Sequence, residues 1–122
     1  MVRIYLKPRD KTGPKAGWFG GKLLYRELVI QAKAAGIMNA VAHHTHFGYS
    51  NGGKLQDEGF EIPNPDLTMC VELISDRSKL EEFCRTHDQL LKNKVIIYKH
   101  IEHWEIGIGA IVAEDALKSA SS

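Results

Sequence analysis

The chain has 122 residues, 43% of them hydrophobic and 25% charged, and a formal net charge of +1. This length suits one domain with one hydrophobic core and does not fit a second, and the nearly neutral charge argues against nucleic acid as the main partner. No apolar run approaches the roughly 20 residues that span a bilayer, and Cys70 and Cys84 form no metal-binding or redox motif. We therefore expect a cytoplasmic protein with reduced thiols that is not itself membrane-spanning.

Apolar periodicity predicts four strands and two helices along the chain. The strands are expected over residues 2–7, 39–47, 67–75 and 95–104. A stripe of Leu24, Leu28 and Ala32 predicts a helix over residues 22–35, and Gly36 is well placed to end it. Asp76 is the expected N-cap of the second helix, whose apolar positions continue to Leu91.

The order β-α-β-β-α-β predicts an α+β fold of the ferredoxin-like type, a sandwich in which a four-stranded antiparallel sheet carries two helices on one face. We expect residues 1–105 to form this domain. Residues 106–122 are then a C-terminal extension that is partly flexible.

One face of the predicted sheet has the composition of a core, with Met69, Val71 and Leu73 pointing the same way along the third strand. The opposite face mixes aromatic, aliphatic and polar residues, whereas a solvated face is usually plainer and more charged. We interpret this second face, with His44 and His46 on it, as an interface between subunits.

The stretch HFGYSNGG, residues 46–53, opens a long polar connection between the second and third strands. Glycines let the backbone approach an anion closely, and successive N–H groups can form an anion-binding nest. The same residues are ordinary turn formers, so a plain turn is the alternative. The carboxylates of this connection are interpreted as solvated loop charge: Asp57, Glu58, Glu61 and Asp66.

Two histidines suggest a metal site. His44 and His46 lie two residues apart on a predicted strand, which places both on one face, where they can share a divalent metal such as zinc. His100 or His103 could complete the site, with Glu72 as a carboxylate ligand. The alternative is a pair of interface histidines that make hydrogen bonds. No nucleophile elbow or Walker-type lysine is present, so we do not expect an enzyme.

Several motifs together resemble a known family: RIYL at the start, Trp18 and Gly20 before Leu24-Tyr25, the glycine–aromatic pair after the second strand, and LTMCVELI. They are similar to the PII-like proteins of domain-of-unknown-function family 190, which resemble the nitrogen-regulatory PII and the CutA proteins. The resemblance covers about residues 2–104 and implies a ferredoxin-like subunit that assembles as a homotrimer.

The resemblance also implies a function. PII proteins bind adenine nucleotides (ATP, ADP, AMP or cyclic forms are the candidates here) in clefts between subunits, and they signal to a target protein through a loop that matches residues 48–66. The expected nucleotide-binding residues are Gly48, Tyr49, Ser50, Asn51, Gly52, Gly53, Lys92, Lys94 and Lys99. A solvated basic turn is the plainer interpretation of the lysines. A CutA-like metal-binding protein that uses His44 and His46 is the alternative function.

Overall fold

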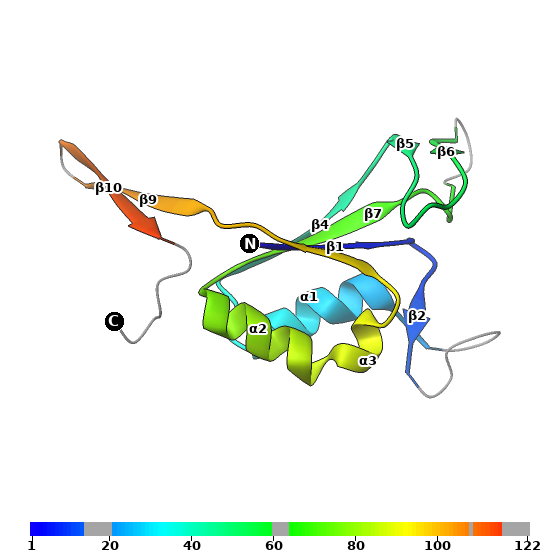
Figure 1. Ribbon diagram of the computed structural model, residues 1–122, viewed down its shortest axis with the longest axis horizontal. Coiled ribbons are helices and arrows are strands. Elements are labelled where there is room, and N and C mark those ends of the chain that lie inside the picture. Colours follow the sequence, from blue (N-terminus) through cyan, green and yellow to red (C-terminus); the bar gives the residue numbers. More distant parts are fainter. Residues whose placement is uncertain (14–20, 60–63, 108, 116–122) are drawn as a thin grey trace.

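Four strands form one antiparallel sheet in the order β4-β7-β1-β8 (Figure 1). The computed structural model describes residues 1–13, 21–59, 64–107 and 109–115, so Trp18 and Gly20 lie outside the described residues. The strands are β1 (Val2–Leu6), β2 (Lys11–Thr12), β3 (Lys22–Leu23), β4 (Asn39–His44), β5 (Phe47–Gly48), β6 (Gln56–Asp57), β7 (Met69–Ile74), β8 (Val95–Tyr98), β9 (Glu102–Gly107) and β10 (Ala110–Asp115). The helices are α1 (Leu24–Ala34), α2 (Arg77–Thr86) and α3 (Asp88–Leu91).

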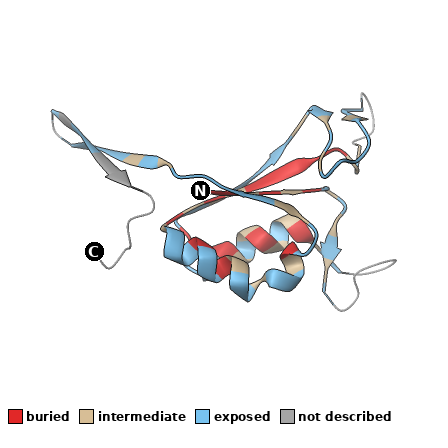
Figure 2. Ribbon diagram, viewed as in Figure 1, coloured by how far each residue is buried: buried red, intermediate tan, exposed pale blue. Residues whose placement is uncertain are grey.

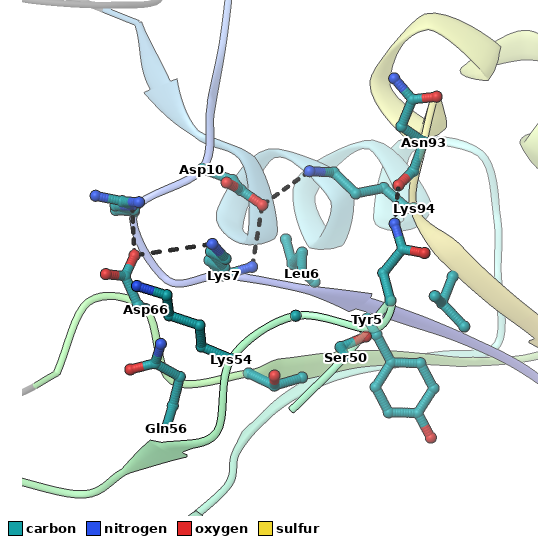
Figure 3. A pocket seen from close by; sticks show the side chains of 15 residues that line it. Tyr5, Leu6, Lys7, Asp10, Ser50, Lys54, Gln56, Asp66, Asn93 and Lys94 are labelled. Carbon is teal, nitrogen blue, oxygen red and sulfur yellow. Dashed lines mark hydrogen bonds and ion pairs between the residues drawn. The ribbon is translucent and has the colours of Figure 1, made fainter. Parts of the chain in front are cut away.

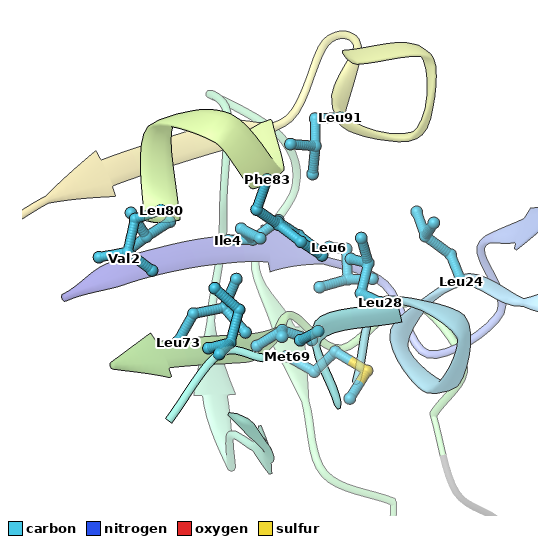
Figure 4. Close-up of a cluster of buried hydrophobic side chains, with 13 residues drawn as sticks. Val2, Ile4, Leu6, Leu24, Leu28, Met69, Leu73, Leu80, Phe83 and Leu91 are labelled. Atoms are coloured by element: carbon cyan, nitrogen blue, oxygen red, sulfur yellow. The ribbon is translucent and has the colours of Figure 1, made fainter. Parts of the chain in front are cut away.

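The helices pack on one face of the sheet, and the core lies between the two layers (Figures 1 and 2). Alternation along β1 and β7 sends every second side chain into this core, as the sequence predicts. The most deeply buried side chains come from both strands and from α1 and α2: Phe83, Ile4, Leu28, Met69, Leu73, Leu80 and Val71 (Figure 4). The α+β architecture is confirmed, and the strand order is consistent with the ferredoxin-like arrangement.

The second helical segment is divided at His87, where the prediction had one continuous helix. The backbone of His87 leaves helical geometry, with φ −110° and ψ 31°, and its ring lies 4.5 Å from that of Phe83. A short helix, α3, restarts directly afterwards, and Leu91 at its end is part of the core cluster. The bend at His87 thus places Leu91 in the core in addition to Phe83.

The predicted fourth strand is also divided. β8 pairs with β1 only as far as Tyr98 opposite Val2, because β1 begins there. The backbones of Met1 and Lys99 still exchange two hydrogen bonds of 2.8 Å. Beyond them the chain leaves the sheet, and β9 pairs with β10 in a separate hairpin (Figure 1). The predicted extension therefore contributes a strand, whereas residues 116–122 lie outside the description.

The predicted face of the second strand needs correction. His44 lies opposite Met69, whose side chain is fully buried, so His44 is on the helix side of the sheet; His43, opposite Cys70, is on the open side. β4 ends at His44, and the hydroxyl of Thr45 donates a hydrogen bond to the carbonyl of Thr68. His46 therefore lies outside β4, and His44 and His46 do not share one strand face.

Candidate functional site

A pocket of about 570 Å³ lies where the end of β1, the start of the 48–66 connection and the turn before β8 come together (Figure 3). Its volume is in the range of small-molecule sites in proteins. These segments are far apart in the sequence, and the sheet brings them together because β1 is paired with both β7 and β8. The lining residues are Tyr5, Leu6, Lys7, Arg9, Asp10, Ser50, Asn51, Gly53, Lys54, Gln56, Asp66, Thr68, Asn93, Lys94 and Val95.

The charged lining favours an anion. Lys7, Arg9, Lys54 and Lys94 supply four positive charges, and Asp10 and Asp66 supply the two negative charges in the lining. Lys54 makes no ion pair or hydrogen bond with any residue that the structure describes. The surplus of two cations, one of them unpaired, matches a ligand that carries phosphate.

Asp10 organises the wall of the pocket that follows β1. Its Oδ2 accepts hydrogen bonds from the backbone N–H of Lys7 at 3.0 Å and from Lys94 Nζ at 2.8 Å. Its carbonyl accepts a 2.8 Å bond from the backbone N–H of Leu24, which fixes the start of α1. Burial acts to raise the pKa of Asp10, but the bonds from Lys94 and Lys7 outweigh burial and leave the pKa below its usual value. Asp10 is therefore a carboxylate at neutral pH and holds the ammonium group of Lys94 in place.

Asp66 forms the opposite side of the pocket. Arg9 Nε lies 2.7 Å from Asp66 Oδ1, and Lys7 Nζ lies 4.0 Å from the same oxygen. That oxygen is buried and accepts no well-aligned hydrogen bond from the described residues. The interpretation of Asp66 as solvated loop charge was wrong. Because β1 and β7 are paired, the residues before β7 lie beside the turn after β1, and Asp66 meets Arg9 there. The single carboxylate of Asp66 therefore offsets only part of the positive charge of Lys7 and Arg9.

Hydrogen bonds join the two ends of the 48–66 connection at its base. β5 and β6 pair, with Gly48 opposite Gln56. Asn64 Nδ2 donates to the Gln56 side-chain carbonyl and to the Asp57 backbone carbonyl, each at 3.0 Å, and Asn64 Oδ1 accepts from the Asp66 N–H at 2.9 Å. Residues 60–63 of the connection lie outside the described part of the chain. The described part nevertheless shows a structured base rather than a free loop.

Two asparagines link this base to the turn before β8. Asn51 and Asn93 have φ values of 52° and 63°, the only positive φ values among non-glycine residues that the structure describes. Asparagine adopts this left-handed conformation more readily than most residues. Asn51 Nδ2 lies 3.4 Å from the carbonyl oxygen of Asn93, so the two turns touch across the pocket (Figure 3). A ligand in the pocket would contact both turns at once.

The structure places the predicted nucleotide-binding residues in three groups. Ser50, Asn51, Gly53 and Lys94 line the pocket. Gly48 lies in β5, and Gly52 makes the turn with φ 65°, whereas Tyr49 is exposed. Lys92 is exposed beside α3, and Lys99 lies at the far end of β8, paired with Met1. These last five residues are not part of the lining within one described chain.

Sequence reasoning missed the part of the pocket that follows the first strand. Lys7 was assigned to the end of the first predicted strand, and no role was predicted for Arg9 or Asp10 directly after it. The signal was available in the run KPRDK, which puts cations and a carboxylate directly after a strand end. Lys54 was also overlooked, because a single lysine after glycines carries no pattern.

The histidines are dispersed. His46 Nδ1 lies 2.6 Å from Glu58 Oε2, and both side chains are largely exposed. Within residues 1–13, 21–59, 64–107 and 109–115, no group of three His, Cys, Asp or Glu side chains is placed to hold a metal ion. Among the described residues, no hydrogen bond or ion pair joins His44, on the helix side of the sheet, to the His46–Glu58 pair. The described residues thus offer no preformed site for the metal-binding alternative.

The His46–Glu58 pair predicts a specific titration. The hydrogen bond and the charge of Glu58 raise the pKa of His46 above its usual value. A raised pKa in the folded state means that the pair stabilises the fold below the unfolded-state pKa and loses this effect as pH rises through the folded-state pKa. In an NMR titration, we expect His46 to titrate above its value in the Glu58→Gln variant. Equal His46 midpoints in the two proteins would show that the pair does not form.

The fold and the pocket define a small α+β protein with a four-stranded antiparallel sheet and a cationic pocket at the base of a long connection. No helix among the described residues has the length and apolar character needed to cross a bilayer. The chain belongs to the DUF190 family, described as "Uncharacterized ACR, COG1993", which matches residues 1–103. The resemblance noted in the sequence is confirmed. The chain is also similar to a UPF0166 protein of Aquifex aeolicus (strain VF5), with 29% identity over 70 residues, 57% of this chain and 73% of that protein.

Proposed function

We propose that this protein is a PII-like regulatory protein that binds an adenine nucleotide in the pocket at the base of the 48–66 connection. The proposal includes a homotrimer in which a neighbouring subunit closes the pocket, a role in signalling rather than catalysis, and a target protein that recognises the connection. The observation that carries the proposal is the pocket of about 570 Å³ with four cationic side chains and Ser50, Asn51 and Gly53 in its wall.

The charges support a phosphate ligand. Lys94 is held by Asp10, whereas Lys54 has no partner among the described residues and extends from the connection itself. Phosphate groups that enter between these lysines would receive charge-assisted hydrogen bonds, which are stronger than neutral ones. Tyr5 also lines the pocket and offers an aromatic surface for a base.

The same residues support a switch. The pocket wall and the first part of the connection share residues, so a bound ligand would contact the connection directly. The shared residues are Ser50, Asn51, Gly53 and Lys54. Asn51 already touches Asn93 of the opposite turn. A ligand that binds more tightly when these turns are together shifts the connection toward that ordered state, which a target protein can distinguish.

Isothermal titration with ATP, ADP, AMP and cyclic AMP tests the binding step. We expect at least one of them to bind with a Kd in the micromolar range, about −8 kcal/mol, and to raise the melting temperature. Affinity should fall as salt is raised, because the contacts are ionic. The absence of both binding heat and a thermal shift with all four nucleotides would disprove the nucleotide proposal.

A further inference from the structure

Asp66 places a fixed negative charge in the wall of the cationic pocket (Figure 3). Its backbone N–H donates to Asn64 Oδ1 at 2.9 Å, and Asn64 is bonded in turn to Gln56 and Asp57 of β6. Its carboxylate lies 2.7 Å from Arg9 Nε, and one of the carboxylate oxygens is buried. The base of the connection and Arg9 thus hold this carboxylate beside any anion that enters the pocket.

The two carboxylates of the lining leave only part of the positive charge for a ligand. Lys94 and Arg9 each lie within 2.8 Å of a carboxylate oxygen. Lys7 Nζ reaches a carboxylate only at 4.0 Å, and Lys54 pairs with no residue that the structure describes. Four cations and two carboxylates leave a charge of +2 in the lining. This surplus balances one phosphate monoester, which carries about −1.5 to −2 at pH 7.

We propose that Asp66 is a specificity-determining residue, which makes the pocket prefer a nucleotide with one phosphate group to nucleotides with two or three. This inference rests on the proposed function, because it concerns the ligand of the same pocket. The lysines that the carboxylates leave available neutralise a single phosphate. Each further phosphate group adds negative charge, and to be neutralised it has to take Arg9 or Lys94 from a carboxylate. That carboxylate then lies without its partner beside the added phosphate, and like charges repel strongly in a partly enclosed site.

The hydrogen bonds of the two carboxylates single out Asp66 rather than Asp10. Oδ2 of Asp10 accepts bonds from both Lys94 Nζ and the Lys7 N–H, so its charge is satisfied within the wall. Oδ1 of Asp66 accepts no well-aligned hydrogen bond from the described residues, although Arg9 Nε lies beside it. A buried oxygen without such a bond has its charge poorly compensated, so Asp66 repels a second phosphate more than Asp10 does.

The Asp66→Asn variant tests this role, because it keeps the shape of the side chain and removes its charge. Isothermal titration calorimetry measures the binding of AMP, ADP and ATP to the full-length wild-type and variant proteins. EDTA is present, so that no divalent cation offsets the charge of the phosphates. The matched control is Asp57→Asn, which removes an exposed carboxylate of the same connection that is not part of the pocket lining. Circular dichroism verifies folding.

We expect the wild-type protein to bind AMP at least about tenfold more tightly than ATP. In Asp66→Asn the affinity for ATP should rise at least about tenfold and that for AMP about threefold or less, whereas Asp57→Asn should change each by less than about twofold. A wild-type protein that binds ATP as tightly as AMP would overturn the inference, as would an Asp66→Asn variant with the wild-type ratio. Both outcomes leave the nucleotide proposal standing. If no nucleotide binds to the wild-type protein, the proposed function itself fails, and this inference fails with it.

Discussion

The Lys94→Met variant is expected to bind the proposed nucleotide about 10- to 100-fold more weakly than wild type, since a charge-assisted hydrogen bond contributes about 1.5–3 kcal/mol. It should also be less stable, because Lys94 Nζ lies 2.8 Å from Asp10 Oδ2 and both side chains are only 23% exposed. Removing the ammonium group leaves a half-buried carboxylate with the Lys7 N–H as its remaining bond, which costs about 1–2 kcal/mol. Titration calorimetry and urea denaturation measure the two effects.

The Lys54→Met variant separates binding from stability. Lys54 lines the same pocket but has no described partner, so its loss should lower affinity similarly and change the unfolding free energy by less than about 0.5 kcal/mol.

Because the pKa of Asp10 is lowered, its stabilising effect is complete above the usual aspartate pKa and is lost as pH falls through the folded-state value. The stability difference between wild type and Lys94→Met should therefore shrink below about pH 4. Unchanged nucleotide affinity in both variants would place the ligand elsewhere.

The Phe83→Ala variant is expected to lower the free energy of unfolding by about 3–5 kcal/mol. Phe83 is 2% exposed and lies at the centre of the core, between α2 and the sheet (Figure 4). Its ring also contacts His87, at the point where α2 gives way to α3. Loss of the ring leaves a cavity that the neighbouring strands fill only in part. Urea denaturation monitored by circular dichroism gives the value.

Phe47 supplies the matched control. Its side chain is 65% exposed in β5, so Phe47→Ala should change stability by less than about 0.5 kcal/mol. If Phe83→Ala cost as little as Phe47→Ala, α2 would not be packed on the sheet as described. A large loss with Phe47→Ala would instead show that β5 is covered in solution, for example by another copy.

Period-two and period-3.6 patterns were sufficient for the central elements. β7 alternates so regularly that Met69, Val71 and Leu73 were assigned to the core correctly. Leu24, Leu28 and Ala32 defined the buried side of α1. Prediction failed where a local contact interrupts the pattern. His87 ends α2 beside Phe83, where one continuous helix was predicted. The face of His44 was wrong for another reason, because pairing with β7 sets His44 opposite the buried Met69, on the helix side.

The sequence by itself determined the family, the α+β class and the segment that forms one wall of the pocket, because each depends on residues close together in the chain. Tertiary structure alone decided the rest of the pocket. Asp10 meets Lys94 only because β1 and β8 are paired, and Arg9 meets Asp66 only because β7 lies on the other side of β1. Contacts between residues 57 or 84 positions apart leave no local periodicity for a sequence pattern to reveal.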